Sequence, residues 1–285
     1  MNSPANKLKQ LLARPEMLVI TGCHDAISAK LSEQANFDAV FMSGFAVSAS
    51  RLALPDTGLI SYAEMLEQGR NICNAVDFPV FGDGDTGFGN AINIKRTVNG
   101  YAQAGFACIM IEDQISPKRC GHTQGKAVVD RDEAFMRIRA AIDARDEGAD
   151  ILIMARTDAR ATHSLDEAIA RAQGFAELGA DISFLEAPET VDEMQQYCDS
   201  VPGDKMVNLI EQSKTPLLPH DQLESMGFKI AVYPLTLLNV SILAMQQALQ
   251  QIKQGKHPAT LDFESIKSTV GFPDYYQAEA RYRLK

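Results

Sequence analysis

Long apolar runs, basic charge and cysteine are all scarce in this sequence, and each shortage excludes a class of protein. No apolar run approaches the roughly 20 residues that a helix needs to cross a bilayer, and residues 1–14 contain no signal-peptide pattern. The chain has 27 basic and 37 acidic residues, a net charge of −10, which argues against a nucleic-acid or anionic-membrane surface. Five scattered cysteines without a Cys-x-x-Cys pair argue against a disulfide framework or structural zinc and predict reduced thiols in a cytoplasm.

The sequence does contain enough apolar material for one large core. Hydrophobic residues make up 46% of the 285 residues and charged residues 22%, a balance typical of globular proteins. No segment rich in Pro, Gly and Ser divides the chain. We therefore expect one domain over residues 1–285, with a helical extension from about residue 258 to residue 285.

Short β-branched and apolar runs recur along the whole chain and alternate with stretches of helical spacing. We expect strands at Met17–Thr21, Ala39–Ser43, Pro79–Asp83, Cys108–Glu112, Ile151–Arg156, Ile182–Glu186, Lys205–Leu209 and Ile230–Tyr233. Apolar residues stand three and four apart, as in amphipathic helices, in Ala63–Ala75, Asp132–Arg145, Leu165–Leu178 and Leu238–Lys253. Eight strands alternating with helices in 285 residues predict an α/β fold, a closed (β/α)₈ barrel of parallel strands.

Two connections in this pattern are long. Residues 44–61 separate the second strand from its helix, and residues 113–130 separate the fourth strand from its helix. Long loops in a compact domain are usually binding or catalytic loops. In a barrel both loops lie at the carboxyl ends of the strands, where barrel enzymes carry out their chemistry.

Polar residues follow most of the expected strands. In chain order these are Ser43 and Gly44, Asp83 and Asp85, Glu112, Arg156, Glu186 and Asn208, with Asp56 in the first long loop. A barrel brings them to one cavity, where packed carboxylates repel one another unless a hard divalent cation is present. Any single acid could be a solvated loop residue, but four acids at successive strand ends favour a magnesium site, with manganese as the other candidate.

The second long loop contains the most specific string of the sequence, Lys118-Arg119-Cys120-Gly121-His122. Cationic neighbours and a histidine lower the pKa of a thiol, so that Cys120 becomes a proton donor or acceptor near neutral pH. We therefore take Cys120, Lys118 and His122 as the catalytic candidates. A Cys–His nucleophile pair is an alternative on spacing alone, but no oxyanion-hole pattern accompanies it.

Arg156 ends an apolar strand and is the candidate for binding a substrate carboxylate. A guanidinium group binds a carboxylate through two parallel hydrogen bonds. The alternative is a structural ion pair with Glu186, and both roles can hold at once.

Taken together, these motifs resemble the isocitrate lyase/phosphoenolpyruvate mutase superfamily. The matching strings, in order over nearly the full length, are Ser43-Gly44, Leu54-Pro55-Asp56, Asp83-Gly84-Asp85-Thr86-Gly87-Phe88-Gly89, Ile111-Glu112-Asp113-Gln114, Lys118-Arg119-Cys120-Gly121-His122 and Ala155-Arg156-Thr157-Asp158. The string around Cys120 indicates the lyase branch, and within it the sequence is similar to 2-methylisocitrate lyases and petal-death-type lyases of 2-alkylmalates and oxaloacetate.

The resemblance implies an assembly and a set of ligands. It implies a homotetramer of (β/α)₈ barrels in which neighbouring subunits exchange a C-terminal helix. It implies Mg²⁺ held by Asp56, Asp83, Asp85 and Glu112. The substrate, a small 2-hydroxy or 2-oxo carboxylate, would contact Ser43, Gly44, Phe45, Asp83, Cys120, Gly121, Arg156, Glu186 and Asn208.

The implied reaction is cleavage of a carbon–carbon bond. Deprotonation of the substrate's 2-hydroxyl breaks the bond between C2 and C3, which leaves a 2-oxo acid and a carbanion that Cys120 protonates. Phe41 replaces a tyrosine that isocitrate lyases use as the proposed hydroxyl base, and Phe45 replaces a glycine of methylisocitrate lyases. An oxaloacetate hydrolase, a phosphonopyruvate-type enzyme or mutase, and a non-catalytic barrel subunit are the alternatives, in decreasing order.

Overall fold

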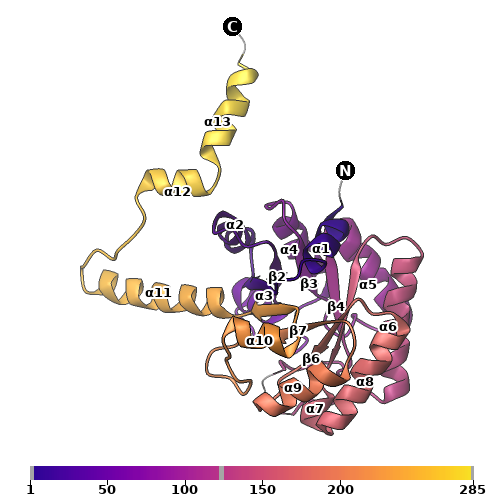
Figure 1. Cartoon of the computed structure of the whole chain (residues 1–285). Coiled ribbons are helices and arrows are strands. Elements are labelled where there is room, and N and C mark those ends of the chain that lie inside the picture. The colour runs from indigo at the N-terminus through magenta and orange to yellow at the C-terminus, as the bar shows by residue number, and fades with distance from the viewer. Residues whose placement is uncertain (1–2, 122–124, 284–285) are drawn as a thin grey trace. The chain divides into compact units, whose positions relative to one another are not determined.

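Eight parallel strands close into a barrel in the computed structural model, which describes residues 3–121 and 125–283 (Figure 1). The strands are β1 (Leu18–Cys23), β2 (Val40–Met42), β3 (Val80–Asp83), β4 (Cys108–Glu112), β5 (Leu152–Thr157), β6 (Ile182–Leu185), β7 (Asp204–Asn208) and β8 (Ile230–Tyr233). Each strand pairs with the next along the chain, and β1 pairs with β8 in the register Leu18↔Ile230. All eight predicted strands are present, so the predicted (β/α)₈ barrel is confirmed.

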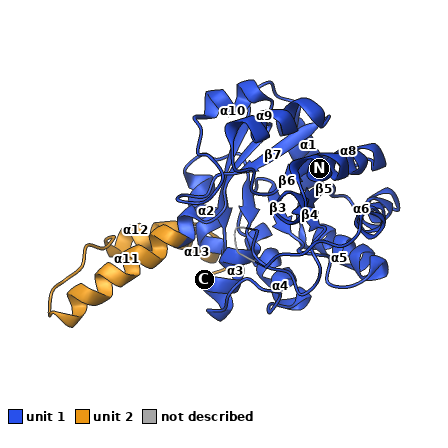
Figure 2. Cartoon of the chain, turned by 90° about the horizontal axis from the view of Figure 1, so that it is seen from below, with its two compact units in different colours: residues 1–238 blue, residues 239–285 orange. Residues whose placement is uncertain are grey.

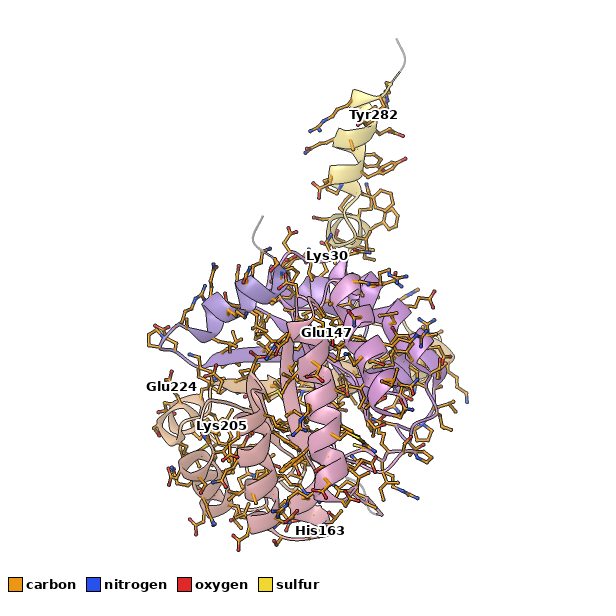
Figure 3. All side chains as sticks on the ribbon, turned by 90° about the vertical axis from the view of Figure 1, so that its right-hand side faces the viewer. Lys30, Glu147, His163, Lys205, Glu224 and Tyr282 are labelled. Atoms are coloured by element: carbon orange, nitrogen blue, oxygen red, sulfur yellow. The ribbon has the colours of Figure 1, made fainter. Side chains whose placement is uncertain are left out.

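Helices follow the strands around the outside of the barrel. Those of the described residues up to β8 are α1 (Pro4–Leu12), α2 (Ala26–Gln34), α3 (Gly44–Leu52), α4 (Tyr62–Cys73), α5 (Ala91–Ala104), α6 (Arg131–Asp146), α7 (Ala159–Thr162), α8 (Leu165–Leu178), α9 (Val191–Ser200) and α10 (His220–Met226). Glu147, just after α6, is exposed on the outside of the barrel (Figure 3). No helix of the described residues combines the length and apolar character that crossing a membrane requires.

Apolar side chains fill the interior of the barrel and the layer between strands and helices. Phe41, Phe81, Met110, Met154 and Phe184 belong to one buried cluster, which strand residues form together with residues of α1. A second cluster joins the strands to helices on the outside. Because both faces of each strand are covered, the strands are apolar along most of their length. This packing leaves the polar residues at the carboxyl ends of the strands.

The chain divides into two compact units, residues 1–238 and residues 239–285 (Figure 2). The first unit contains the whole barrel. The second consists of most of α11 (Thr236–Lys253), together with α12 (Phe263–Thr269) and α13 (Phe272–Arg281). The domain limits expected from the sequence, and the exchange of a C-terminal helix, stay predictions.

The first long connection is not a loop throughout, contrary to the sequence-based expectation. Residues 44–52 form α3, and Ser43 accepts a hydrogen bond at its start from the backbone N–H of Ala46. The helix has only nine residues and follows β2 directly, so it is too short for its apolar spacing to be told apart from that of the strand. In the second connection, residues 113–130, the described residues form one isolated bridge, between Gln114 and Val128.

Candidate active site

A pocket lies among the residues that follow the carboxyl ends of the strands. About 450 Å³ of space lies between its lining atoms, and part of that space is open to solvent. Its lining includes Phe41, Ser43, Phe45, Asp56, Asp83, Met110, Lys118, Cys120, Gly121, Arg156, Phe184, Glu186, Asn208, Ile210, Pro234 and Leu235. Most of the site residues expected from the sequence are thus brought together, while His122 lies outside the described residues.

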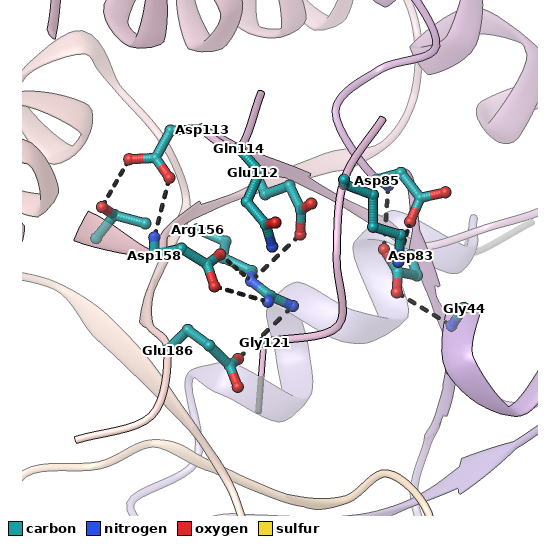
Figure 4. Close-up of polar contacts among 12 residues, drawn as sticks. Gly44, Asp83, Asp85, Glu112, Asp113, Gln114, Gly121, Arg156, Asp158 and Glu186 are labelled. Carbon is teal, nitrogen blue, oxygen red and sulfur yellow. Dashed lines mark hydrogen bonds and ion pairs between the residues drawn. The ribbon is translucent and has the colours of Figure 1, made fainter. Parts of the chain in front are cut away.

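The carboxylates are grouped around the ammonium of Lys118. Its Nζ lies 2.5 Å from Oδ1 of Asp56 and 2.8 Å from Oδ1 of Asp85, and all three side chains are buried. Asp83 lies beside them and accepts hydrogen bonds from the backbone N–H groups of Gly44 and Asp85, each at 3.0 Å (Figure 4). Lys118, expected as a catalytic residue, is therefore an ion-pair partner of two predicted metal ligands.

The pKa values of this group follow from burial and charge. Burial raises the pKa of Asp85 to about 7, although Lys118 opposes that shift. Burial also raises the pKa of Glu112 well above its ordinary value, against the opposing charge of Arg156. Burial alone would lower the pKa of Lys118, but the surrounding carboxylates raise it well above its usual value, so this lysine is charged.

The donor set fits a hard divalent cation. As the side chains stand, no group of three or more His, Cys, Asp or Glu among the described residues is arranged to hold a metal ion. Yet all four predicted acids are buried, and Oε1 of Glu112 has no hydrogen-bond partner within the described chain, whereas Oδ1 of Asp56 and of Asp85 face the ammonium of Lys118. Buried carboxylate oxygens in this state are the ligand type that Mg²⁺ takes.

Arg156 is the centre of a second group of charges. Its guanidinium lies 3.3 Å from Glu112 and 3.6 Å from Glu186, and it donates two hydrogen bonds to Asp158, at 2.9 and 3.2 Å (Figure 4). Asn208 donates to Glu186 at 3.4 Å. The ion pair with Glu186 that the sequence offered as an alternative role is therefore present, and Arg156 also lines the pocket.

Gly121 lies directly against this second group. A Cβ atom built on Gly121 would stand 2.5 Å from Nη2 of Arg156 and 2.5 Å from Oε1 of Glu186, closer than real Cβ atoms come. The preceding residue, Cys120, is half-buried and lines the same pocket. A side chain at this position would displace Arg156 or Glu186, so the glycine beside Cys120 is what lets the backbone lie this close to both groups.

Two residues that hold this loop had no assigned role in the sequence analysis. The side chain of Gln114 donates to the carbonyl of Arg119 at 2.9 Å and accepts from its N–H at 3.0 Å. Lys126 donates to Asp158 at 3.0 Å and to the carbonyl of Gly121. Gln114 stands in a string that resembles the superfamily, but no signal in the sequence indicated the contact of Lys126.

The chain is similar to known proteins over nearly its full length. A family model described as phosphoenolpyruvate phosphomutase matches residues 8–253. The 2,3-dimethylmalate lyase of Eubacterium barkeri is 40% identical over 287 residues, an alignment that covers 99% of each chain. The 2-methylisocitrate lyase of Aeropyrum pernix is 37% identical, over 99% of this chain and 92% of its own.

Solved structures share the whole fold. Oxaloacetate acetylhydrolase in complex with the inhibitor 3,3-difluorooxalacetate has a TM-score of 0.94 and 31% identity, covering 98% of this chain and 96% of its own. Phosphonopyruvate hydrolase in complex with oxalate and Mg²⁺ has a TM-score of 0.87 and 30% identity, over 98% and 99%. The chain is therefore an enzyme, a carbon–carbon lyase, and it belongs to the isocitrate lyase/phosphoenolpyruvate mutase superfamily.

Proposed function

We propose that this lyase cleaves a 2-hydroxy dicarboxylate of the 2-alkylmalate or 2,3-dimethylmalate type. The products are a 2-oxo acid such as pyruvate and a second carboxylic acid. The observation that carries the proposal is a single pocket lined by Asp56, Asp83, Lys118, Cys120 and Arg156. Such a pocket offers acidic ligands, cations for substrate carboxylates and a proton donor within one small volume.

The buried acids support magnesium as the cofactor. Asp56, Asp83, Asp85 and Glu112 would hold the ion, with manganese as a substitute. Bound there, the ion would stabilise the negative charge that the substrate's 2-oxygen carries once its proton has been removed, before the bond to C3 breaks. All four side chains are buried and supply oxygen atoms, which agrees with the ligand preference of Mg²⁺.

The remaining polar residues bind and orient the substrate. Arg156 would bind one substrate carboxylate, with Glu186 and Asn208 keeping its guanidinium in place. Ser43 and Gly44 would contact the other carboxylate at the start of α3: the Ser43 hydroxyl can donate to it, while the N–H of Gly44 stays on Asp83.

Proton transfer is assigned to Cys120. When the bond between C2 and C3 breaks, its electron pair stays on C3, and the Cys120 thiol donates a proton to that carbon and becomes a thiolate. The proton of the 2-hydroxyl goes to another base of the pocket, because Phe41 lines the pocket with a ring that has no hydroxyl. His122 and Lys118 complete the proposed catalytic set, with Lys118 keeping the acids in place.

The apolar part of the pocket favours an alkyl substituent over a third carboxylate. Phe45, Ile210, Pro234 and Leu235 contribute to the lining and carry no charge. A tricarboxylate such as 2-methylisocitrate needs a further cationic partner, because a carboxylate buried against apolar groups loses its hydration. Of the two lining cations, Lys118 is paired with Asp56 and Asp85, and Arg156 is assigned to the first substrate carboxylate, so neither is left for a third.

Hydrolysis of oxaloacetate to oxalate and acetate is the second candidate. The structural likeness to oxaloacetate acetylhydrolase favours it, with a TM-score of 0.94. Oxaloacetate has no alkyl substituent to occupy the apolar part of the pocket around Phe45, and for this reason we rank it second.

One assay separates the candidates. Purified enzyme is given 2,3-dimethylmalate, 2-methylisocitrate or oxaloacetate, with Mg²⁺ or with EDTA, and the products are measured by chromatography. We expect the largest kcat/KM with dimethylmalate, no turnover in EDTA, and no cleavage by C120S, which still binds pyruvate. The matched variant C73S, whose sulfur is outside the pocket lining, keeps its activity. Dominant release of oxalate would replace the first candidate by the second.

The C-terminal unit supports the proposed homotetramer with an exchanged helix. No residue of α12 or α13 is buried, and Leu238 is the buried residue of α11. Amphipathic helices gain most of their stability from a packed face. We therefore assign the apolar side chains of residues 239–285 to contacts with neighbouring copies of the chain. The five cysteines, all among the described residues, form no disulfide, which suits the proposed cytoplasmic location.

A further inference from the structure

Lys126 is a buried lysine that the proposed chemistry does not use. Its Nζ donates to Oδ1 of Asp158 at 3.0 Å and also to the carbonyl oxygen of Gly121. The side chains of Lys126 and Asp158 are 4% and 0% exposed. Burying an ammonium group costs free energy unless an opposite charge and hydrogen bonds compensate it. The two groups that Lys126 connects, Asp158 and the Gly121 carbonyl, therefore indicate its role.

Asp158 connects Lys126 to the pocket. The same carboxylate accepts two hydrogen bonds from the guanidinium of Arg156, at 2.9 and 3.2 Å. Burial alone would raise the pKa of Asp158, but the charges and hydrogen bonds of Arg156 and Lys126 outweigh burial and lower it to about 2. Asp158 is therefore ionised at neutral pH, and it is also fixed through its backbone N–H, which donates to Asp113 at 2.9 Å.

Gly121 is held from two sides. Its α-carbon lies against Arg156 and Glu186, as the close approach of a built Cβ to both groups shows. Its carbonyl oxygen accepts the hydrogen bond of Lys126. Cys120 is bonded to Gly121 through one peptide bond, so its backbone position depends on both contacts.

We propose that Lys126 is a positioning residue, whose ammonium ties the Gly121 carbonyl to Asp158 and thereby fixes the Cys120 thiol relative to Arg156. The role rests on the proposed function of Cys120 as proton donor. Asp158 acts on two parts of the site, because it orients Arg156, which would bind the substrate, and Lys126, which holds the loop of Cys120.

This arrangement predicts that loss of the Lys126 ammonium lowers kcat and leaves KM nearly unchanged. In K126M the Gly121 carbonyl loses its link to Asp158, while Arg156 keeps both of its hydrogen bonds to that carboxylate. Substrate binding should change little, with KM within about threefold of the wild type. A displacement of the thiol by about 1 Å should lower kcat on the order of 100-fold.

The experiment compares K126M, K126R and the control variant K95M. Lys95 also forms a lysine–carboxylate ion pair, with Glu147 on the outside of the barrel, so K95M repeats the chemical change outside the pocket. We measure kcat and KM with dimethylmalate, and the rate at which iodoacetamide alkylates Cys120, followed by peptide mass spectrometry. We expect K126M to lose activity and to react severalfold faster, K126R to recover at least part of both, and K95M to match the wild type.

Each outcome bears on the proposal. Unchanged kcat and alkylation in K126M would overturn it, as would equal losses in K95M or a rise in KM without a fall in kcat. If K126M does not fold, K126R and K126Q provide the same comparison. If the wild type cleaves none of the substrates, the proposed function fails, while the alkylation rates still decide whether Lys126 fixes the loop.

Discussion

At the scale of single residues, Gly121 gives the sharpest test of the site. In G121A the new Cβ would stand 2.5 Å from both Arg156 and Glu186, so the loop or the arginine must move. We expect kcat/KM to fall about 100-fold. Steady-state kinetics measure this change, and thermal unfolding checks the fold.

The control for Gly121 is Gly203, which has open space around a built Cβ and a positive φ of 80°. G203A therefore strains the backbone without a collision, and it should lower the unfolding temperature while kcat/KM stays unchanged. Equal kinetic losses in both variants would mean that Gly121 has no special contact.

A second residue-scale prediction concerns Lys118, which compensates the charge of two buried acids. K118M removes that ammonium and leaves Asp56 and Asp85 without their ion-pair partner. Breaking a buried ion pair on one side costs about 3–5 kcal/mol, so we expect a loss of about 3 kcal/mol in the free energy of unfolding. Mg²⁺ should restore more stability to K118M than it adds to the wild type, measured by urea denaturation.

The variant K95M again serves as the control for Lys118. Its ion pair with Glu147 has an exposed partner, and such pairs contribute less than about 1 kcal/mol. If Mg²⁺ stabilises K118M no more than K95M, the carboxylates around Lys118 are not its site.

For single residues, the sequence predicted which strand-end side chains meet, but it did not predict every contact of the site. Asp83, Glu112 and Arg156 stand at the ends of successive strands, and a barrel directs the carboxyl ends of all its strands to one side. The sequence therefore predicted that these side chains would lie at one site, where Asp83 and Arg156 line the pocket and Arg156 pairs with Glu112. The sequence could not predict that Lys118 would pair with the acids. Its long side chain can reach many points, and the backbone of a loop decides which of them it reaches.

At the scale of elements, periodicity predicted the strands better than the helices near the site. Parallel strands covered on both faces have continuous apolar runs, and all eight were found from these runs. Residues 44–52 were expected to be a loop because α3 has only nine residues and follows β2 directly, so periodicity does not separate it from the strand. That helix places the N–H of Gly44 on Asp83, a contact that depends on tertiary structure.

At the scale of the whole molecule, residues 239–285 carry the apolar surface on which the proposed assembly rests. Fourteen of the 23 large apolar side chains exposed in the described residues lie in this unit. Surface so rich in exposed apolar groups marks an interface. We therefore expect F263E combined with F272E to convert the proposed tetramer into smaller species, as measured by light scattering during gel filtration.

The control places the same charge on the barrel. Ile92 is 73% exposed and Phe263 is 74% exposed, so I92E alters an equally accessible apolar residue outside the C-terminal unit and should leave the mass unchanged. A wild-type monomer would contradict the assembly. So would a double variant whose mass equals that of the wild type, because a buried carboxylate pair at an apolar interface costs more than such contacts supply. The physical point is that α12 and α13 have no buried residue within the described chain, and a helix of seven or ten residues needs a partner to be stable.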